Sequence, residues 1–285
     1  MIAEFLDIEQ HLKRRFREDS ITDILIASLL SLPGNDVVVQ TPSEAKTGGD
    51  FDLVIVAPAS EDAVQFRVQA KRLTPHANDW TTGSYVELSH PHNSGVQSRL
   101  LISGVGRESL PTIPLYAFYN PAHVCAASDE TVTGIELASG WEIRERVKAM
   151  VKIKPKRLPY KRIGSLQPLF FPLSTILCPP RLVGAPAIPL PTEVRSAVEE
   201  AIETRSALAG LGQTLRIPAP PEVQVLAGPD SGRRRGSDAV PRDLRARQLP
   251  AIIRTAIERR GERIMPARVK RPRVILIAED KPAET

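Results

Sequence analysis

The segment that most limits how this chain can fold is 47–73, TGGDFDLVIVAPASEDAVQFRVQAKRL. Two apolar runs, 51–57 and 64–73, are rich in Val, Ile, Leu, Ala and Phe, and a polar stretch around 58–62 separates them. β-Branched and aromatic residues favour strands, whereas Pro, Ser and Asp favour the turn between them. The segment therefore predicts two β-strands joined by a polar turn.

Polar side chains interrupt this apolar pattern at regular positions. Successive side chains of a strand point to opposite faces, so Gln69 and Lys71 share one face and Arg72 lies on the other. By the same parity, Asp50 and Asp52 share a face at the start of the first strand. If the strands pair as a hairpin in a suitable register, a carboxylate, an amide oxygen and an ammonium group meet at one point. These three groups are the minimum set of functional groups that a Mg²⁺-dependent phosphodiesterase needs.

The segments on either side of the hairpin predict further elements. Residues 3–16 have an amphipathic helical pattern, and a capping-box pattern at Ser20–Asp23 precedes a core helix that ends before Pro33. The favoured role of Asp23 is therefore that of a helix cap. The other expected elements are a strand at 37–41, a helix that begins at 96 and a buried strand at 114–119. The resulting order is helix, strand, strand, strand, helix, strand.

These motifs resemble a known family. GGDFDLVIV followed by VQAKRL resembles the PD-(D/E)XK nuclease superfamily, in the branch in which glutamine replaces the acidic residue of the last motif. REDSITDILIASLL and PLYAFYNP also resemble an uncharacterised bacterial subgroup of that superfamily. The resemblance implies an α/β fold, restriction-endonuclease-like, with an αβββαβ core and a mixed central sheet. It further implies an endonuclease that hydrolyses phosphodiester bonds in DNA with Mg²⁺ or Mn²⁺, in a bacterial defence or restriction setting.

The resemblance assigns roles to the polar residues of the hairpin. Asp50 is the expected carboxylate ligand of the metal, with Asp52 as the alternate, and Gln69 offers its amide oxygen. Lys71 is expected to orient or deprotonate the attacking water and to offset charge that develops at the phosphorus. The alternative for the two aspartates is turn chemistry before a strand, and the alternative for Lys71 is a solvated strand end.

A neutral amide in place of an acid weakens metal binding unless another acid compensates. In the superfamily an acid from the first helix often reaches the metal, which implies Glu18 or Asp19. Glu44 lies in a loop with Gly48–Gly49 that can bring it over the site, although a solvated turn carboxylate explains it equally well.

Basic residues are distributed unevenly along the chain. The strip 152–162 contains Lys152, Lys154, Lys156, Arg157, Lys161 and Arg162 without an acidic residue. It is either a solvated loop or a surface that contacts nucleic-acid phosphates, with Arg72 contributing from the rim of the site or bracing the fold. A second basic region, 233–273, has fourteen lysines and arginines but four acids. Both regions favour a polyanionic partner, and the resemblance implies that this partner is DNA.

Other residues give weaker indications. His76, His90 and His92 lie in a polar insertion, and their spacing favours a solvated loop over a metal site. Cys125 and Cys178 are expected to be reduced, buried thiols. No apolar run approaches the length of a membrane helix, and the charged start of the chain is unlike a signal peptide. We therefore expect a cytoplasmic protein without a membrane partner.

The chain is expected to divide into a nuclease-like domain, 1–180, and a C-terminal region, 181–285, of proline-rich linkers and basic helices. In the second part we expect helices at 193–208 and 244–260 and an edge strand at 274–277. Two other functions stay open: a nucleic-acid-binding module of the same fold with a weak or inactive site, and a scaffold that docks a protein partner. The sequence leaves homo-oligomerisation open.

Overall fold

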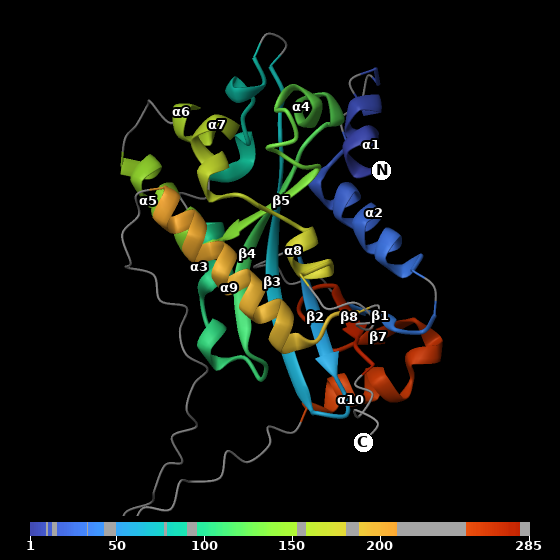
Figure 1. Cartoon of the computed structure of the whole chain (residues 1–285). Coiled ribbons are helices and arrows are strands. Elements are labelled where there is room, and N and C mark those ends of the chain that lie inside the picture. Colours follow the sequence, from blue (N-terminus) through green and yellow to red (C-terminus); the bar gives the residue numbers. More distant parts are fainter. Residues whose placement is uncertain are drawn as a thin grey trace, which may run out of the picture.

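The computed structural model describes residues 1–9, 11–12, 16–32, 34–42, 50–76, 79–89, 96–152, 158–180, 188–209 and 249–279. The described strands form one mixed sheet of eight in the order β6-β5-β4-β3-β2-β8-β1-β7 (Figure 1). Their bounds are β1 Val37–Pro42, β2 Phe51–Ala57, β3 Asp62–Arg72, β4 Thr112–Tyr119, β5 Ile135–Ser139, β6 Phe171–Pro172, β7 Ile264–Ala267 and β8 Arg273–Ile277. The expected α/β class with a mixed sheet is confirmed.

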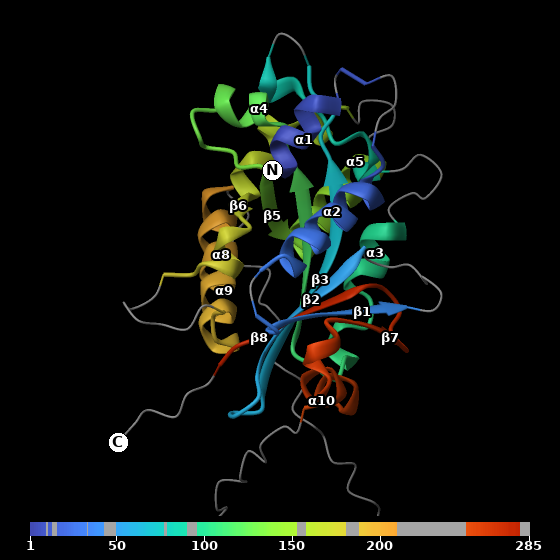
Figure 2. The same ribbon diagram turned by 90° about the vertical axis from the view of Figure 1, so that its right-hand side faces the viewer.

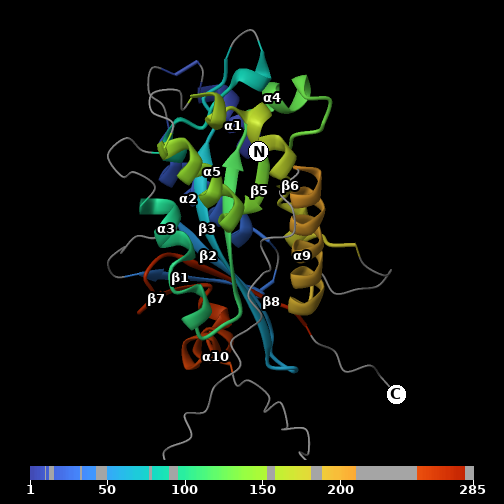
Figure 3. The same ribbon diagram turned by 90° about the vertical axis from the view of Figure 1, so that its left-hand side faces the viewer.

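Helices cover both faces of this sheet (Figures 2 and 3). One face carries α1 Ile2–Glu9, α2 Glu18–Leu30, α8 Ser174–Leu177 and α9 Pro191–Leu208. The other face carries α3 Val96–Ile102, α5 Gly140–Lys152, α7 Ile163–Leu166 and α10 Ala251–Glu258. The remaining helices are α4 Ala122–Ala127, α6 Leu158–Lys161 and the 3₁₀ turns η1 Trp80–Thr82, η2 Val86–Ser89, η3 Val105–Arg107, η4 Gln167–Leu169 and η5 Arg260–Glu262. No helix in these described parts is long and apolar enough to cross a membrane.

The central hairpin forms as predicted. β2 and β3 pair antiparallel, with Phe51 opposite Val68 and Ala57 opposite Asp62. β4 then pairs parallel to β3. The order α2, β1, β2, β3, α3, β4 matches the predicted order of helices and strands. Nearly every residue of β2 is apolar because helices cover both faces of the sheet there.

The strand β8 corrects two expectations. It was expected at an edge of the sheet, but it lies inside the sheet, parallel to β2 and antiparallel to β1. Val274 and Leu276 of this strand, together with three apolar side chains from α9, belong to the same core as side chains of β2 and β3. The expected division at residue 180 is therefore wrong for the described elements, because segments from both sides of it build one sheet and one core.

The first two helices also differ from their predicted bounds. α1 ends at Glu9 rather than at residue 16, and two apolar residues of the predicted helix, Ile8 and Leu12, are exposed. α2 begins at Glu18, so Ser20 does not cap it and Asp23 lies exposed inside the helix. The predicted capping role of Asp23 is wrong because an earlier turn starts the helix.

The two faces of the sheet differ in their chemistry. On the face that α2 and α9 cover, one continuous apolar core extends across the strands. On the other face the apolar side chains form two separate clusters, one under α5 and one under α10. Between them lie buried polar side chains from three strands, which are Gln40, Asp52, Gln65, Arg67, Gln69 and Lys71. A polar band of this kind is costly to bury, so it marks the region where a function is to be sought.

We expect a C-terminal strand substitution to destabilise the whole fold. Leu276 is 2% exposed in β8, whereas Ile264 is 57% exposed in the edge strand β7. Leu276→Ala should lower the free energy of unfolding by about 2–5 kcal/mol, because it leaves a cavity in the shared core. Ile264→Ala is the matched control and should change it by about 0.5 kcal/mol or less. Urea unfolding followed by tryptophan fluorescence tests this, and two separate transitions with only one shifted would contradict a shared core.

Candidate active site

Asp50 and Gln69 face each other at the start of β2. The amide of Asp50 donates to the carbonyl of Val68 at 2.7 Å, which extends the hairpin by one residue and sets Asp50 opposite Gln69. Gln69 Nε2 donates to both carboxylate oxygens of Asp50, at 2.9 and 2.8 Å. The backbone N–H of Ala70 donates to Asp50 Oδ2 at 2.5 Å. The structure thus brings together the carboxylate and the amide that the sequence placed on one face.

The surroundings of Asp50 disfavour its charged form. Burial raises the pKa of this carboxyl from 3.8 to about 6, and the charges of Glu18 and Asp19 act in the same direction. The ammonium of Lys71 and the N–H of Ala70 lower the pKa but only partly offset the burial. A carboxylate with this environment gains from a nearby cation, because the cation compensates the charge that water no longer solvates.

Lys71 pairs with an acid from the first turn of α2. Its Nζ lies 3.0 Å from Glu18 Oε1, and its side chain is 2% exposed. The backbone N–H of Arg72 donates to the other carboxylate oxygen of Glu18, at 3.0 Å. Glu18 therefore fixes the end of β3 against the start of α2, where the helix dipole favours a negative charge. Of the two acids suggested for the first helix, Glu18 is the one in contact with Lys71.

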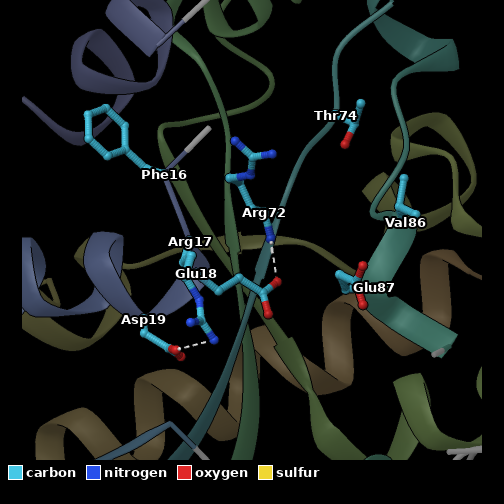
Figure 4. A pocket seen from close by; sticks show the side chains of 8 residues that line it. All are labelled: Phe16, Arg17, Glu18, Asp19, Arg72, Thr74, Val86 and Glu87. Carbon is cyan, nitrogen blue, oxygen red and sulfur yellow. Dashed lines mark hydrogen bonds and ion pairs between the residues drawn. The ribbon is translucent and has the colours of Figure 1, made fainter. Parts of the chain in front are cut away.

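An open pocket of about 460 Å³ adjoins this ion pair (Figure 4). Glu18, Arg72 and Asp19 line it together with Phe16, Arg17, Thr74, Val86 and Glu87. Figure 4 shows the Glu18 carboxylate beside the backbone of Arg72. Because Glu18 also contacts Lys71, this residue links the pocket to the Asp50–Gln69–Lys71 group.

The other acids considered as ligands are placed differently. Asp52 lies on the same face as Asp50, but its carboxylate is 3.6 Å from Arg271 and from Arg273. Burial is the largest effect on Asp52 and raises its pKa, while the two arginines lower it. Asp19 lines the pocket at 70% exposure, 3.5 Å from Arg17. Glu44 lies outside the described residues.

Several residues expected to contact nucleic acid have structural roles. Lys161 is buried, and its ammonium donates to the carbonyls of Val86 at 2.6 Å and Ser89 at 3.2 Å, so the predicted phosphate contact is wrong for this lysine. Arg72 binds Glu9 of α1, which supports the bracing role. Lys152 is exposed at the end of α5 and Arg162 is partly buried. Lys154, Lys156 and Arg157 lie outside the described residues.

Among the described residues, the remaining sequence indications give no second site. His76 is exposed, while His90 and His92 lie outside the described residues. Both cysteines are free, but only Cys125 is partly buried, and Cys178 is exposed, so the prediction of two buried thiols is wrong for Cys178. Burial raises the pKa of the Cys125 thiol to about 11, so this thiol stays protonated near neutral pH.

The chemistry of the donors near Asp50 fits a hard divalent cation. Asp50 and Glu18 offer carboxylate oxygens and Gln69 offers an amide oxygen, which are the ligand types that Mg²⁺ and Mn²⁺ take. In the part of the chain that the structure describes, no three His, Cys, Asp or Glu side chains are grouped to hold a metal. A cation here would therefore depend on the amide of Gln69 and on water for part of its shell.

Comparison with known proteins places the chain in a family without an assigned function. No curated protein and no solved structure matches the chain. A model of one family, described as a family of unknown function (DUF6615), matches residues 1–283. Because this match spans nearly the whole length, the chain belongs to the DUF6615 family.

Proposed function

We propose that the protein is a metal-dependent endonuclease that hydrolyses phosphodiester bonds in DNA. The observation that carries the proposal is the convergence of Asp50, Gln69 and Lys71 at one point of the sheet, with Glu18 beside them. These residues supply carboxylates, an amide and an ammonium group within one largely buried region. The resemblance of the surrounding motifs to PD-(D/E)XK nucleases, in the QxK variant, supports the same reaction class.

Asp50 and Gln69 are the proposed metal-holding pair. A bound Mg²⁺ or Mn²⁺ supplies an activated water and charge compensation at the phosphate. Gln69 now presents its amide nitrogen to Asp50, which suits a carboxylate without a cation. Rotation of the amide by half a turn presents Oε1 instead, so the same side chain serves the protein with and without the ion. Glu18 and, from outside the described residues, Glu44 would complete the negative charge.

Lys71 is the proposed partner of the attacking water and of the phosphate. Its ammonium is almost fully buried and has one carboxylate partner, Glu18, within the described structure. The low exposure strengthens its interaction with any anion that enters the site. Glu18 holds this ammonium in place through the ion pair, so its proposed role is to position Lys71.

One assay tests the proposal against its rivals. Plasmid, linear duplex and single-stranded DNA are incubated with the full chain, with and without Mg²⁺ or Mn²⁺, beside Asp50→Ala and Lys71→Ala. We expect metal-dependent cleavage by the wild type and none by either variant. Salt-sensitive DNA binding without cleavage would instead favour a binding module of the same fold. Absence of any nucleic-acid binding would favour a scaffold protein.

A further inference from the structure

A row of polar side chains crosses four neighbouring strands on the same face as Gln69. The strand register pairs Gln40 of β1 with Arg273 of β8, Arg273 with Asp52 of β2, and Asp52 with Arg67 of β3. Arg271, which lies two residues before Arg273, is also buried and approaches Asp52. We call Arg67, Arg271, Arg273 and Asp52 the arginine row.

The arginine row carries an excess of positive charge. Arg67 binds Glu108, and Asp52 is the carboxylate nearest to Arg271 and Arg273. Three guanidinium groups thus face two carboxylates, which leaves one positive charge. Arginine does not lose its proton under ordinary conditions, so this charge cannot be removed by titration. A buried uncompensated charge is costly, whereas one monoanion in the row neutralises it.

Hydrogen-bond donors in the row also exceed the acceptors. Within the described structure, Nε of Arg67, Arg271 and Arg273 and Nη1 of Arg271 have no hydrogen-bond partner, whereas one acceptor of the row, Asp52 Oδ1, lacks a partner. Gln65 Nε2, on the same face of β3, has none either. The separations of 3.6 Å to Asp52 are too long for hydrogen bonds. A buried donor without a partner costs about 1–3 kcal/mol, so an oxygen-rich anion would relieve several such costs together.

From this charge and donor excess we infer that the arginine row is a binding subsite for one phosphodiester group of a nucleic-acid strand. The guanidinium donors match the oxygens of such a group, and its single negative charge equals the excess in the row. The identification of the anion as nucleic-acid phosphate rests on the proposed function, while the presence of an anion site rests on the row itself.

The position of the row suits a phosphate next to the one that is cleaved. Arg67 precedes Gln69 by two residues on β3, and Asp52 follows Asp50 by two residues on β2. Two residues of a strand span about 7 Å and return to the same face. Neighbouring phosphates of one strand can bridge such a distance, so the row would hold the strand while Asp50, Gln69 and Lys71 face the adjacent bond.

The first test measures anion binding without catalysis. The full chain is heated in inorganic phosphate or in chloride at equal ionic strength, with EDTA throughout. We expect phosphate to raise the melting temperature of the wild type saturably, and the shift to disappear in Arg271→Gln. The exposed Arg268→Gln is the matched control and should keep the shift. Asp52→Asn has the opposite expectation, a larger shift at the same phosphate concentration, because it removes the negative charge beside the anion.

The second test measures DNA affinity in EDTA over a range of salt concentrations. Arg271→Gln should weaken binding about tenfold and reduce the slope of log affinity against log salt by about 1. Equal phosphate shifts in wild type and Arg271→Gln, or a wild type that responds alike to phosphate and chloride, would overturn the subsite. Phosphate binding by a protein that never cleaves DNA would overturn the nuclease and leave the subsite standing.

If Arg271→Gln fails to fold, Asp52→Asn still tests whether the arginine row binds an anion. Asparagine has nearly the shape of aspartate, so it changes the charge of the row without opening a cavity, and unfolding in the absence of phosphate shows whether the variant is folded. A phosphate shift that is unchanged or smaller in Asp52→Asn contradicts an anion held beside this carboxylate.

Discussion

Asp50→Asn should abolish metal-dependent DNA cleavage and at the same time stabilise the protein measured without metal. Burial raises the pKa of Asp50 from 3.8 to about 6, so the folded state holds a penalised charge at neutral pH. One unit of pKa shift corresponds to about 1.4 kcal/mol, so we expect Asp50→Asn to gain about 2–3 kcal/mol of unfolding free energy at pH 7.5. Asparagine keeps an oxygen for the N–H of Ala70, and Gln69 can turn its amide oxygen toward the new amide.

The stability gained by Asp50→Asn over the wild type should increase as the pH rises. Between the unfolded pKa of 3.8 and the folded pKa of about 6, the folded state binds more protons than the unfolded state. Stability attributable to Asp50 therefore falls as the pH rises through this window and stays low above it. Urea unfolding at pH 3.5, 5, 6 and 7.5 should show wild type and Asp50→Asn converging at the lowest pH and separating toward the highest. Asp129→Asn, an exposed aspartate, is the control and should follow the wild type.

Metal binding should make the wild type more stable than Asp50→Asn, which is the reverse of the order expected without metal. Mn²⁺ added at pH 7.5 should raise the melting temperature of the wild type but not that of Asp50→Asn, because the ion needs the ionised carboxylate. At pH 5 protons compete for Asp50, and the Mn²⁺ effect on the wild type should weaken. An equal Mn²⁺ shift in both proteins would show that Asp50 does not hold the ion.

Lys71→Met should remove cleavage while leaving metal binding intact. Methionine fills much of the volume of this buried side chain but cannot orient water or offset charge at the phosphate. The expected loss in cleavage rate is about 10²–10⁴-fold, the usual contribution of a positioned acid–base group. The Mn²⁺ shift of the melting temperature should stay close to the wild type, which separates Lys71 from Asp50.

The matched control for this substitution is Lys161→Met. Lys161 is also a buried lysine, but it donates to the carbonyls of Val86 and Ser89. Its loss should lower the melting temperature, because two backbone carbonyls lose a charged donor, and should leave the cleavage rate per folded molecule unchanged. If both lysine variants lost activity in proportion to their loss of stability, Lys71 would be structural. The rate is measured on duplex DNA at saturating Mg²⁺.

Sequence periodicity was enough to predict which side chains share a face at the candidate site. The alternation along 64–73 placed Gln69 and Lys71 on one face, and the structure has them there. Parity also placed Asp52 with Asp50 but could not say which of them meets Gln69. The register decides this, because Asp50 lies opposite Gln69 whereas Asp52 lies opposite Arg67 and Arg273.

The remaining features depend on strands that pair although they are far apart in the sequence, and local sequence patterns do not predict such pairing. The run Val274–Ile277 is equally apolar for an edge or an inner strand, and nothing nearby in sequence indicates that β1 and β2 take it between them. The arginine row could not be predicted for the same reason, because its members come from β2, β3 and the C-terminal segment, which are far apart in the sequence. Within the run 152–162, local charge did not distinguish two lysines that differ in the structure. Lys161 is buried and donates to two carbonyls, whereas Lys152 is exposed.

The inner position of β8 has a consequence for biosynthesis. While the ribosome is still making the C-terminal segment, β1 and β2 lack the strand that joins them, and the amide of Asp52 lacks its acceptor, the carbonyl of Pro272. Non-local pairing of this kind forms late, because a long stretch of chain must first be closed into a loop. We therefore expect nascent chains to remain without a completed sheet, so that a DNA-cutting activity would be withheld until translation has passed β8.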